Sequence, residues 1–353
     1  MPLIRAALTR RQPQRSPIAS VQVRPQPVKT VLVLGGAGYL GSVMVGLLLR
    51  HGFKVRVLDL LLFGDRSLKE FKPHPNFELI QGDVRNIGVV ERSMSACEAV
   101  IHLAAIVGDA ACQEQKALAL EINCAATPKL AETARNCGVG RFIFASSCSV
   151  YGSSDNFLDE LSPLNPLSLY ARTKQDSEDM LLNARSRYFA TTILRLGTLF
   201  GLSPRMRFDL IVNMFVAQAA RSRRITVWNG EQWRPFLHVD DAARGFMACL
   251  DAAPAFISGQ IFNVGSPDLN CRIRSLGEEV VQLIPNTCLC AIESDDRRNY
   301  RVSFEKIQNV LGFKSRKNLA FGIEEIYASL RSRAVPELAA ERFNVIGVQE
   351  KAL

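Results

Sequence analysis

Tyr170 and Lys174 stand four positions apart in a segment, residues 168–187, whose pattern predicts a helix, so both side chains should project from one face. A phenol with a pKa near ~10 is a poor base at neutral pH, but a neighbouring ammonium group stabilises its phenolate form. The pair could therefore remove a proton from a substrate hydroxyl. Ser147, which follows a predicted strand, could orient that hydroxyl. Because a tyrosine and a lysine at this spacing are common on helices, the surrounding elements must decide what the pair means.

The stretch TVLVLGGAGYLG at residues 30–41 reads as a buried strand followed by a glycine loop, and residues 42–50 read as a helix. In that context glycine lets the backbone approach a pyrophosphate, and the helix N-terminus offers free N–H groups to the phosphates. Two registers fit the glycine pattern, Gly36-x-Gly38-x-x-Gly41 and Gly35-x-x-Gly38-x-x-Gly41. An ordinary tight turn is the alternative, but the flanking strand and helix favour a dinucleotide site.

An acidic residue follows the second predicted strand, residues 54–58, at Asp59. It lies 18 residues beyond Gly41, and the dinucleotide fold uses an acidic residue at about this spacing to hold the adenosine ribose hydroxyls. A carboxylate there would repel a 2′-phosphate, and no Arg or Lys follows directly, so the sequence favours NAD over NADP. A helix or turn cap is the alternative role for Asp59.

Further strands are predicted at residues 77–80, 99–103, 141–145 and 191–196, with helices between most of them. This alternation predicts an α/β fold with a doubly wound parallel (Rossmann) sheet and a site at the carboxyl ends of its strands. Asp83 could accept from the adenine amino group, Ala104 leaves room for a flat cofactor, and Lys174 could also bind the nicotinamide ribose. The residues expected to line NAD are Gly35, Gly38, Tyr39, Leu40, Gly41, Asp59, Asp83, Val84, Leu103, Ala104, Ala105, Tyr170 and Lys174.

The composition divides the chain of 353 residues into four parts. Residues 1–29 are basic, contain no Asp or Glu and carry five prolines, which predicts a disordered arm. Residues 30–200 form the predicted NAD-binding domain with the catalytic residues. Residues 201–332 are expected to form mainly a smaller substrate-binding lobe, with some segments returning to the sheet. Residues 333–353 are assigned as a C-terminal tail.

The net charge of +9 lies in the arm and in scattered arginines without a recognisable binding motif, so we expect no nucleic-acid partner. No apolar run is long enough to span a bilayer, and we expect no membrane association. Nine cysteines at irregular spacing, without a C-x-x-C pair, and four unclustered histidines predict reduced thiols and no metal site. These features favour a cytoplasmic protein, although the basic arm also resembles an organelle transit peptide.

Seven motifs together resemble the NAD-dependent epimerase/dehydratase family, extended short-chain dehydrogenases/reductases that act on nucleotide sugars. They occur in the family's order over about residues 30 to 332, which makes the resemblance specific. The motifs are GGAGYLG (35–41), GDVR (82–85), IHLAA (101–105), SSCSVYG (146–152), YARTK (170–174), LRLGTLFG (194–201) and RPFLHVDD (234–241).

The resemblance implies roles for further residues. The family's catalytic serine or threonine stands four residues before the tyrosine of its VYG turn, which selects Ser147 here. Asn123 matches a helix asparagine near the active site and joins the expected cofactor residues. Four residues are expected to join Ser147 in contacting the substrate. They are Thr198, where many 4-epimerases have an asparagine, Asn213, and the arginines Arg234 and Arg298, placed to grip a pyrophosphate. A solvated surface ion pair is the alternative for each arginine.

One departure from the family narrows the chemistry. Its 4,6-dehydratases carry an acidic pair or a glutamate directly after the catalytic serine or threonine, where this chain has Cys148 and Ser149. Dehydration and the related decarboxylation are therefore disfavoured. We expect an NAD-dependent epimerase acting at C4 of a nucleotide-diphosphate hexose through a transient 4-keto intermediate. The alternatives are a nucleotide-4-ketosugar reductase of a deoxysugar pathway and a non-catalytic NAD-binding regulatory protein. The resemblance also implies a homodimer formed through the helices that contain Asn123 and Tyr170.

Overall fold

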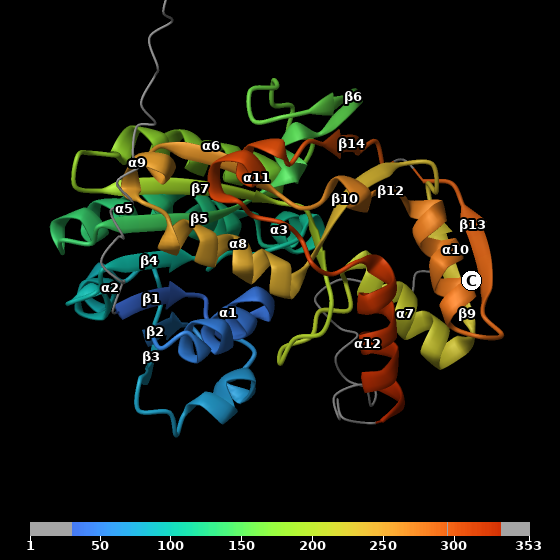
Figure 1. Ribbon diagram of the computed structural model, residues 1–353, viewed down its shortest axis with the longest axis horizontal. Coiled ribbons are helices and arrows are strands. Elements are labelled where there is room, and N and C mark those ends of the chain that lie inside the picture. Colours follow the sequence, from blue (N-terminus) through green and yellow to red (C-terminus); the bar gives the residue numbers. More distant parts are fainter. Residues whose placement is uncertain (1–29, 295, 333–353) are drawn as a thin grey trace, which may run out of the picture.

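A parallel sheet of seven strands forms the centre of the computed structural model, which describes residues 30–294 and 296–332 (Figure 1). Its strand order is β11-β7-β5-β4-β1-β2-β3, and every neighbouring pair is parallel. The prediction of a doubly wound α/β fold is confirmed. The strands are β1 (Thr30–Leu34), β2 (Lys54–Asp59), β3 (Phe77–Gln81), β4 (Ala99–His102), β5 (Arg141–Ser147), β7 (Ala190–Leu196) and β11 (Gln260–Val264).

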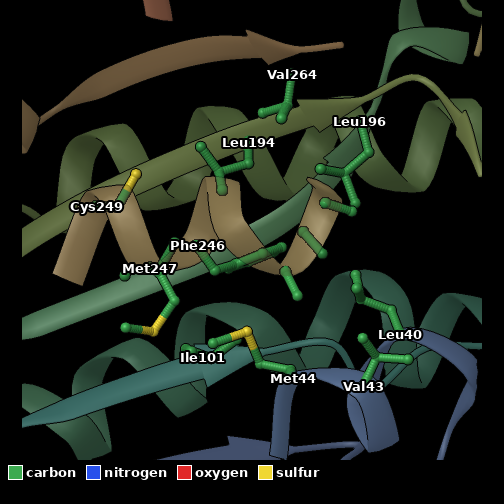
Figure 2. Packing of buried hydrophobic residues seen from close by; sticks show 14 of the residues in the cluster. Leu40, Val43, Met44, Ile101, Leu194, Leu196, Phe246, Met247, Cys249 and Val264 are labelled. Atoms are coloured by element: carbon green, nitrogen blue, oxygen red, sulfur yellow. The ribbon is translucent and has the colours of Figure 1, made fainter. Parts of the chain in front are cut away.

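Strand β1 is apolar throughout because both faces of the sheet are covered. Val31 and Val33 point into one hydrophobic cluster, and Leu32 and Leu34 point into the other, as the two-residue period of a strand requires. The first cluster contains side chains of α1 (Tyr39–Arg50) and α8 (Val239–Asp251) and is shown in Figure 2. The second contains side chains of α2 (Ile87–Met94), α5 (Ala126–Asn136) and α6 (Leu169–Ala184).

A smaller group of elements lies beyond one end of the sheet, at the right of Figure 1. Helices α7 (Ile211–Ser222), α10 (Ile273–Leu283) and α12 (Leu319–Arg331) share a third hydrophobic cluster with β9 (Arg224–Trp228), which pairs with β13 (Cys288–Ile292). The carboxyl ends of the central strands therefore face a second lobe. Its other elements are β8 (Thr198–Phe200), β10 (Trp233–His238) and β12 (Asn270–Arg272) in one sheet, and β14 (Asn299–Val302), which pairs with β6 (Ser153–Leu158). The short helices α9 (Pro254–Ile257) and α11 (Glu305–Leu311) lie outside this lobe and pack on the central sheet.

Residues 114–137 read from the sequence as a single helix, but the structure divides this segment. The chain instead forms α3 (Asp109–Glu114), α4 (Lys116–Ala119), a π-helical turn over Leu120–Ala125, and then α5. The carbonyl oxygen of Asn123 accepts hydrogen bonds from the hydroxyls of Ser177 (2.6 Å) and Thr127 (3.1 Å). Side chains thus replace part of the regular helical pairing, and a π turn of this kind often marks a functional site.

The terminal segments assigned as an arm and a tail lie outside the described residues. Within residues 30–332, except for residue 295, no helix is long and apolar enough to cross a membrane. In the same part of the chain, no group of three or more His, Cys, Asp or Glu side chains could hold a metal ion.

Candidate active site

The glycine loop after β1 and the first turn of α1 pack so closely that Gly35 and Gly41 have no room for a side chain. Gly35 has a φ of +84°, and a Cβ there would lie 2.7 Å from the backbone nitrogen of Ala104. A Cβ on Gly41 would overlap the carbonyl oxygen of Gly35. Helix α1 begins at Tyr39, three residues earlier than predicted, directly after the loop. This cradle of bare backbone beside a helix N-terminus fits a dinucleotide diphosphate.

Replacing Gly41 with alanine is expected to weaken NAD binding by about tenfold or more, because the new methyl group would displace the Gly35 carbonyl and the amide groups that follow it. Titration calorimetry with NAD measures the effect. Gly88→Ala is the matched control, because a Cβ on Gly88 would make only ordinary van der Waals contacts (3.6 Å and longer). Equal affinity of Gly41→Ala and wild type would contradict this account of the loop.

Asp59 lies beside the glycine loop, as a ribose-binding role requires. One carboxylate oxygen accepts a hydrogen bond from the backbone N–H of Ala37 (2.9 Å), and the other accepts from Leu61 (2.8 Å). The carboxylate therefore also caps the turn at Leu61, which was the alternative role. Both roles are compatible because each oxygen has a second lone pair.

The other expected adenosine-side residues follow β3 and β4. Arg85 forms an ion pair with Asp83 (2.6 Å), and its guanidinium holds the pKa of that carboxyl below its usual range. Asp83 is therefore an ionised acceptor, although part of its capacity is used by Arg85. Leu103 donates its backbone N–H to the carbonyl of Leu34 (2.9 Å), which brings the end of β4 against the end of β1. The remaining residues of this set are the buried Val84 and the partly buried Ala104 and Ala105.

Tyr170 and Lys174 lie in the first turns of α6, which begins after Ser168. The hydroxyl of Ser168 accepts the backbone N–H of Ala171 (3.2 Å) and caps the helix. The ammonium nitrogen of Lys174 donates to the carbonyl oxygen of Ala145 in β5 (2.8 Å) and lies 5.7 Å from the centre of the Tyr170 ring. The structure thus brings the predicted pair together at the end of β5.

Burial has opposite effects on the pKa values of these two groups. It lowers the pKa of Lys174 to about 8, and it raises the pKa of Tyr170 above its ordinary value. Both shifts have one cause, because a poorly solvated pocket disfavours the ammonium and the phenolate alike. Ionisation of Tyr170 therefore depends on positive charge placed close to it.

Ser147 ends β5 and is positioned to donate a hydrogen bond. Its hydroxyl oxygen accepts the backbone N–H of Ser149 (3.1 Å), which leaves its proton free for a substrate oxygen. Neither of the next two side chains supplies an acid. Cys148 is buried and donates its thiol to the carbonyl of Arg195 (3.3 Å), and burial raises the pKa of that thiol.

Asn123 does not have a free side chain for the cofactor, which corrects that assignment. It is 2% exposed, its amide oxygen accepts the backbone N–H of Ile106, and its amide nitrogen donates to the carbonyl of Ile106, both at 2.8 Å. The side chain therefore fixes the loop after β4.

The side chains of two more expected cofactor residues, Tyr39 and Leu40, are used within the protein. The hydroxyl of Tyr39 donates to the carbonyl of Gly201 (2.7 Å), and its carbonyl accepts from Ser203 (2.7 Å). Leu40 is buried in the apolar layer between α1 and α8 (Figure 2). Neither side chain is available to NAD, and Tyr39 instead ties the glycine loop to the chain that leads into the second lobe.

Arg234 and Arg298 lie together on the second lobe and share Asp296. The distance from Asp296 is 3.3 Å for Arg234 and 2.6 Å for Arg298, and Arg234 also donates to the carbonyl of Arg298. Arg298 also pairs with Asp109 (2.5 Å) at the start of α3. Because Arg234 is buried, it is not the solvated surface pair considered as the alternative.

Asn213 was expected to contact the substrate, and the structure contradicts this. Its side chain is fully buried, its oxygen accepts the N–H of Gly201 (3.1 Å), and its nitrogen donates to the carbonyl of Arg207 (2.9 Å) and to the hydroxyl of Tyr39 (3.3 Å). Every polar atom is occupied by the protein. Thr198, the remaining substrate candidate, begins β8 opposite Phe236 and is partly buried.

Arg207 was missed from the sequence, where residues 206–220 read as a helix; the helix begins only at Ile211. The guanidinium of Arg207 forms an ion pair with Asp209. It also lies close to Gly108, because a Cβ added to that glycine would be 3.9 Å from a guanidinium nitrogen of Arg207. Its positive charge opposes the rise that burial causes in the pKa of Tyr170. No spacing rule marks this arginine, because the link to Tyr170 is made only in the fold.

Replacing Arg207 with glutamine is expected to move the rising limb of the pH–rate profile to higher pH, because the substitution removes a charge that favours the Tyr170 phenolate. Arg207→Lys retains the charge and should restore much of the profile. Arg205→Gln, two positions away, is the control, because its guanidinium stacks on the ring of Phe63 (3.8 Å) instead. An unchanged limb in Arg207→Gln would show that this charge does not act on Tyr170.

The residues present fit NAD, because the loop offers a cradle that side chains would fill and Asp59 stands beside it. The model of the NAD dependent epimerase/dehydratase family matches residues 31–265. A dTDP-glucose 4,6-dehydratase of Actinoplanes sp. is 27% identical over 323 residues, 86% of this chain and 98% of that protein. UDP-glucuronic acid decarboxylase 6 of Arabidopsis thaliana is 27% identical over 340 residues, 92% and 95% of the two chains.

Among solved structures, MoeE5 in complex with UDP-glucose and NAD is similar with a TM-score of 0.74 and 28% identity, over 85% of this chain and 99% of that chain. The family match covers the glycine loop, Asp59 and the three residues Ser147, Tyr170 and Lys174 that the fold brings to one edge of the sheet. The chain therefore belongs to the NAD-dependent epimerase/dehydratase family.

Proposed function

We propose that this protein is an NAD-dependent nucleotide-sugar epimerase that acts at C4 of a nucleotide-diphosphate hexose through a transient 4-keto intermediate. One observation carries the proposal. Ser147 ends the strand whose Ala145 carbonyl Lys174 contacts, Lys174 lies 5.7 Å from the centre of the Tyr170 ring, and the residue immediately after the serine is not an acid. The set can move a hydroxyl proton but has nothing at that position to expel water.

The chain's own residues suffice for the proton steps. Ser147 donates a hydrogen bond to the C4 oxygen and fixes its position. Tyr170 takes the hydroxyl proton and later returns it, while Lys174 favours the phenolate. NAD, when bound, supplies an acceptor for the hydride from C4 and a donor that returns it to the other face of the keto sugar. No net oxidation results, so the same cofactor can serve each turnover.

Two guanidinium groups support a diphosphate-bearing substrate. Arg234 and Arg298 both pair with the carboxylate of Asp296. A planar guanidinium group can donate two parallel hydrogen bonds to two oxygens of a phosphate. A sugar diphosphate would take the place of Asp296 and Asp109 on these groups. The related MoeE5, which was solved with UDP-glucose and NAD, supports a nucleotide sugar as the ligand.

The names of the curated relatives point to two other reactions, dehydration and decarboxylation. Cys148 argues against dehydration, because it stands where the dehydratases have an acidic residue. Its thiol is buried and donates to the carbonyl of Arg195. A 4-ketosugar reductase shares every residue of the site, but its reaction consumes the reduced cofactor. Reaction stoichiometry therefore separates the candidates.

The test is incubation of the purified protein and NAD with a panel of UDP-, dTDP-, GDP- and CDP-hexoses, followed by proton NMR of the products. We expect one substrate to give its C4 epimer with no net change in absorbance at 340 nm. If every member of the panel stayed unepimerised, the proposal would fail. Product formation with stoichiometric oxidation or reduction of the nicotinamide would identify the reductase instead.

A further inference from the structure

A buried ion pair lies directly behind the turn that carries Ser147. Glu178, on α6, and Arg195, in β7, are 1% and 3% exposed, and their closest nitrogen and oxygen atoms are 2.6 Å apart. The Nε of Arg195 also lies 3.1 Å from both carboxylate oxygens, so the contact is a fork between two planar groups. Neither residue has a place in the proton steps proposed above.

The side chains of this pair make two contacts with the residues that flank Ser147, and the backbone of Arg195 makes a third. The hydroxyl of Ser146 donates to Glu178, the Nη1 of Arg195 donates to the hydroxyl of Tyr151 (2.9 Å), and the thiol of Cys148 donates to the carbonyl of Arg195 (3.3 Å). The turn is thus fixed immediately before, immediately after and four residues beyond the catalytic serine. Ser147 itself keeps its proton free.

Helix α6 completes the connection, because it carries Tyr170, Lys174 and Glu178 at intervals of four residues. Lys174 holds the carbonyl of Ala145, and Glu178 holds the side chain of Ser146, the next residue of β5. Two successive residues of the strand are therefore cross-linked to the helix that presents the tyrosine. These two links, together with the pairing of β5 and β7, hold the end of β5 against the helix that carries Tyr170.

Stability alone gives a poor reason for such a pair. Removing two charges from water is costly, and well-packed apolar side chains of similar volume often serve a fold equally well. An ion pair with satisfied geometry does, however, fix orientation more strictly than apolar contacts do. Because the pair contacts residues on both sides of Ser147, its fixed orientation would also fix the position of that serine.

We propose that Glu178 and Arg195 are positioning residues that hold Ser147 at its working distance from Tyr170. The catalytic part of this inference rests on the proposed function. The structural part, the clamping of residues 146–151, does not. A test with one readout for each part therefore distinguishes failure of the clamp from failure of the epimerase assignment.

The main variant is the double substitution Glu178→Leu with Arg195→Met, which removes both charges and leaves no unpaired ion. The control is Asp241→Asn with Arg244→Met, which removes another ion pair with a buried carboxylate (2.6 Å), on α8. Ser146→Ala removes only the hydroxyl contact with Glu178 and keeps the ion pair. It tests the same clamp if the double variant does not fold.

The first readout needs no activity. In the NAD-loaded protein, the rate at which iodoacetamide alkylates Cys148 is followed by mass spectrometry, with the buried Cys249 of α8 as the reference for general unfolding. We expect Cys148 to react about tenfold faster in the double variant and faster in Ser146→Ala, with Cys249 unchanged, because the turn loses side-chain anchors on both sides of Ser147 or, in Ser146→Ala, one of them. Cys148 protection equal to wild type in a folded variant would overturn the clamp.

The second readout is steady-state turnover of the sugar nucleotide that the wild type epimerises. We expect kcat to fall by about 10²-fold in the double variant with KM changed little, because displacement of a reacting group by about 1 Å has this effect. The control pair should retain kcat. A folded double variant with wild-type kcat would also overturn the proposal. If the wild type epimerises no sugar nucleotide, the assignment fails and the alkylation result alone decides the clamp.

Discussion

Replacing Tyr170 with phenylalanine is expected to reduce kcat by about 10²- to 10⁴-fold, the usual contribution of a positioned general acid–base group. The ring remains and only the hydroxyl is lost, so NAD should bind with nearly unchanged affinity. The effect is large because the hydroxyls and thiol at the end of β5 are not suited to take the proton. Ser147 is a hydrogen-bond donor with an ordinary hydroxyl, and Cys148 is buried against Arg195.

Turnover is measured by NMR of the product, and NAD affinity by titration calorimetry. Tyr188→Phe is the matched control because Tyr188 is an exposed tyrosine at the far end of the same helix–strand unit. Wild-type turnover in Tyr170→Phe would contradict the assignment of the proton step. Loss of NAD binding together with turnover would mean that the hydroxyl supports the cofactor site.

Replacing Lys174 with methionine is expected to change the pH dependence of stability as well as to abolish most turnover. Burial lowers the pKa of Lys174 from 10.5 to about 8, and its ammonium is held by the carbonyl of Ala145. Between these two values the unfolded chain binds more protons than the folded protein does. The free energy of unfolding of the wild type should therefore rise with pH through this window.

The Lys174→Met variant has no ammonium group at this position, so its free energy of unfolding should not show this rise with pH. Relative to the variant, the cofactor-free wild type should gain about 2 kcal/mol of unfolding free energy between pH 7 and pH 9.5. Urea unfolding of both proteins at the two pH values measures the difference. Lys69→Met, at an exposed position, controls for loss of a lysine as such. A gain of zero, or one of opposite sign, would show that the ammonium is not buried at a cost.

Local patterns predicted the central sheet, and they marked the candidate catalytic pair Tyr170 and Lys174, which the fold keeps together. Each of these features can be recognised from a few neighbouring positions. They are the apolar strand β1, the closely packed glycines that follow it, and a tyrosine and a lysine one helical turn apart. The side chain of Asp59 lies beside the loop because β2 pairs with β1 in register. These features depend on short stretches of chain, so the sequence sufficed for them.

The rest depends on contacts between distant residues. Asn213 has the polarity of a ligand, but its amide is used by Gly201 and Tyr39. Arg207 influences the pKa of Tyr170 from a segment that precedes its helix instead of belonging to it. Arg195 forms its ion pair with Glu178 between a strand and a helix that are separate in the sequence. No periodicity encodes such pairings. The homodimer and the cytoplasmic location stay predictions.

Transfer of deuterium from C4 of the substrate tests the central claim most directly. Nucleotide hexoses deuterated at C4 are incubated with the NAD-loaded protein, and the product is examined by NMR and mass spectrometry. The account predicts a C4 epimer that retains deuterium at C4, with no reduced cofactor left at completion. Deuterium at C6 with loss of water, loss of carbon dioxide, or stoichiometric reduced cofactor would contradict it.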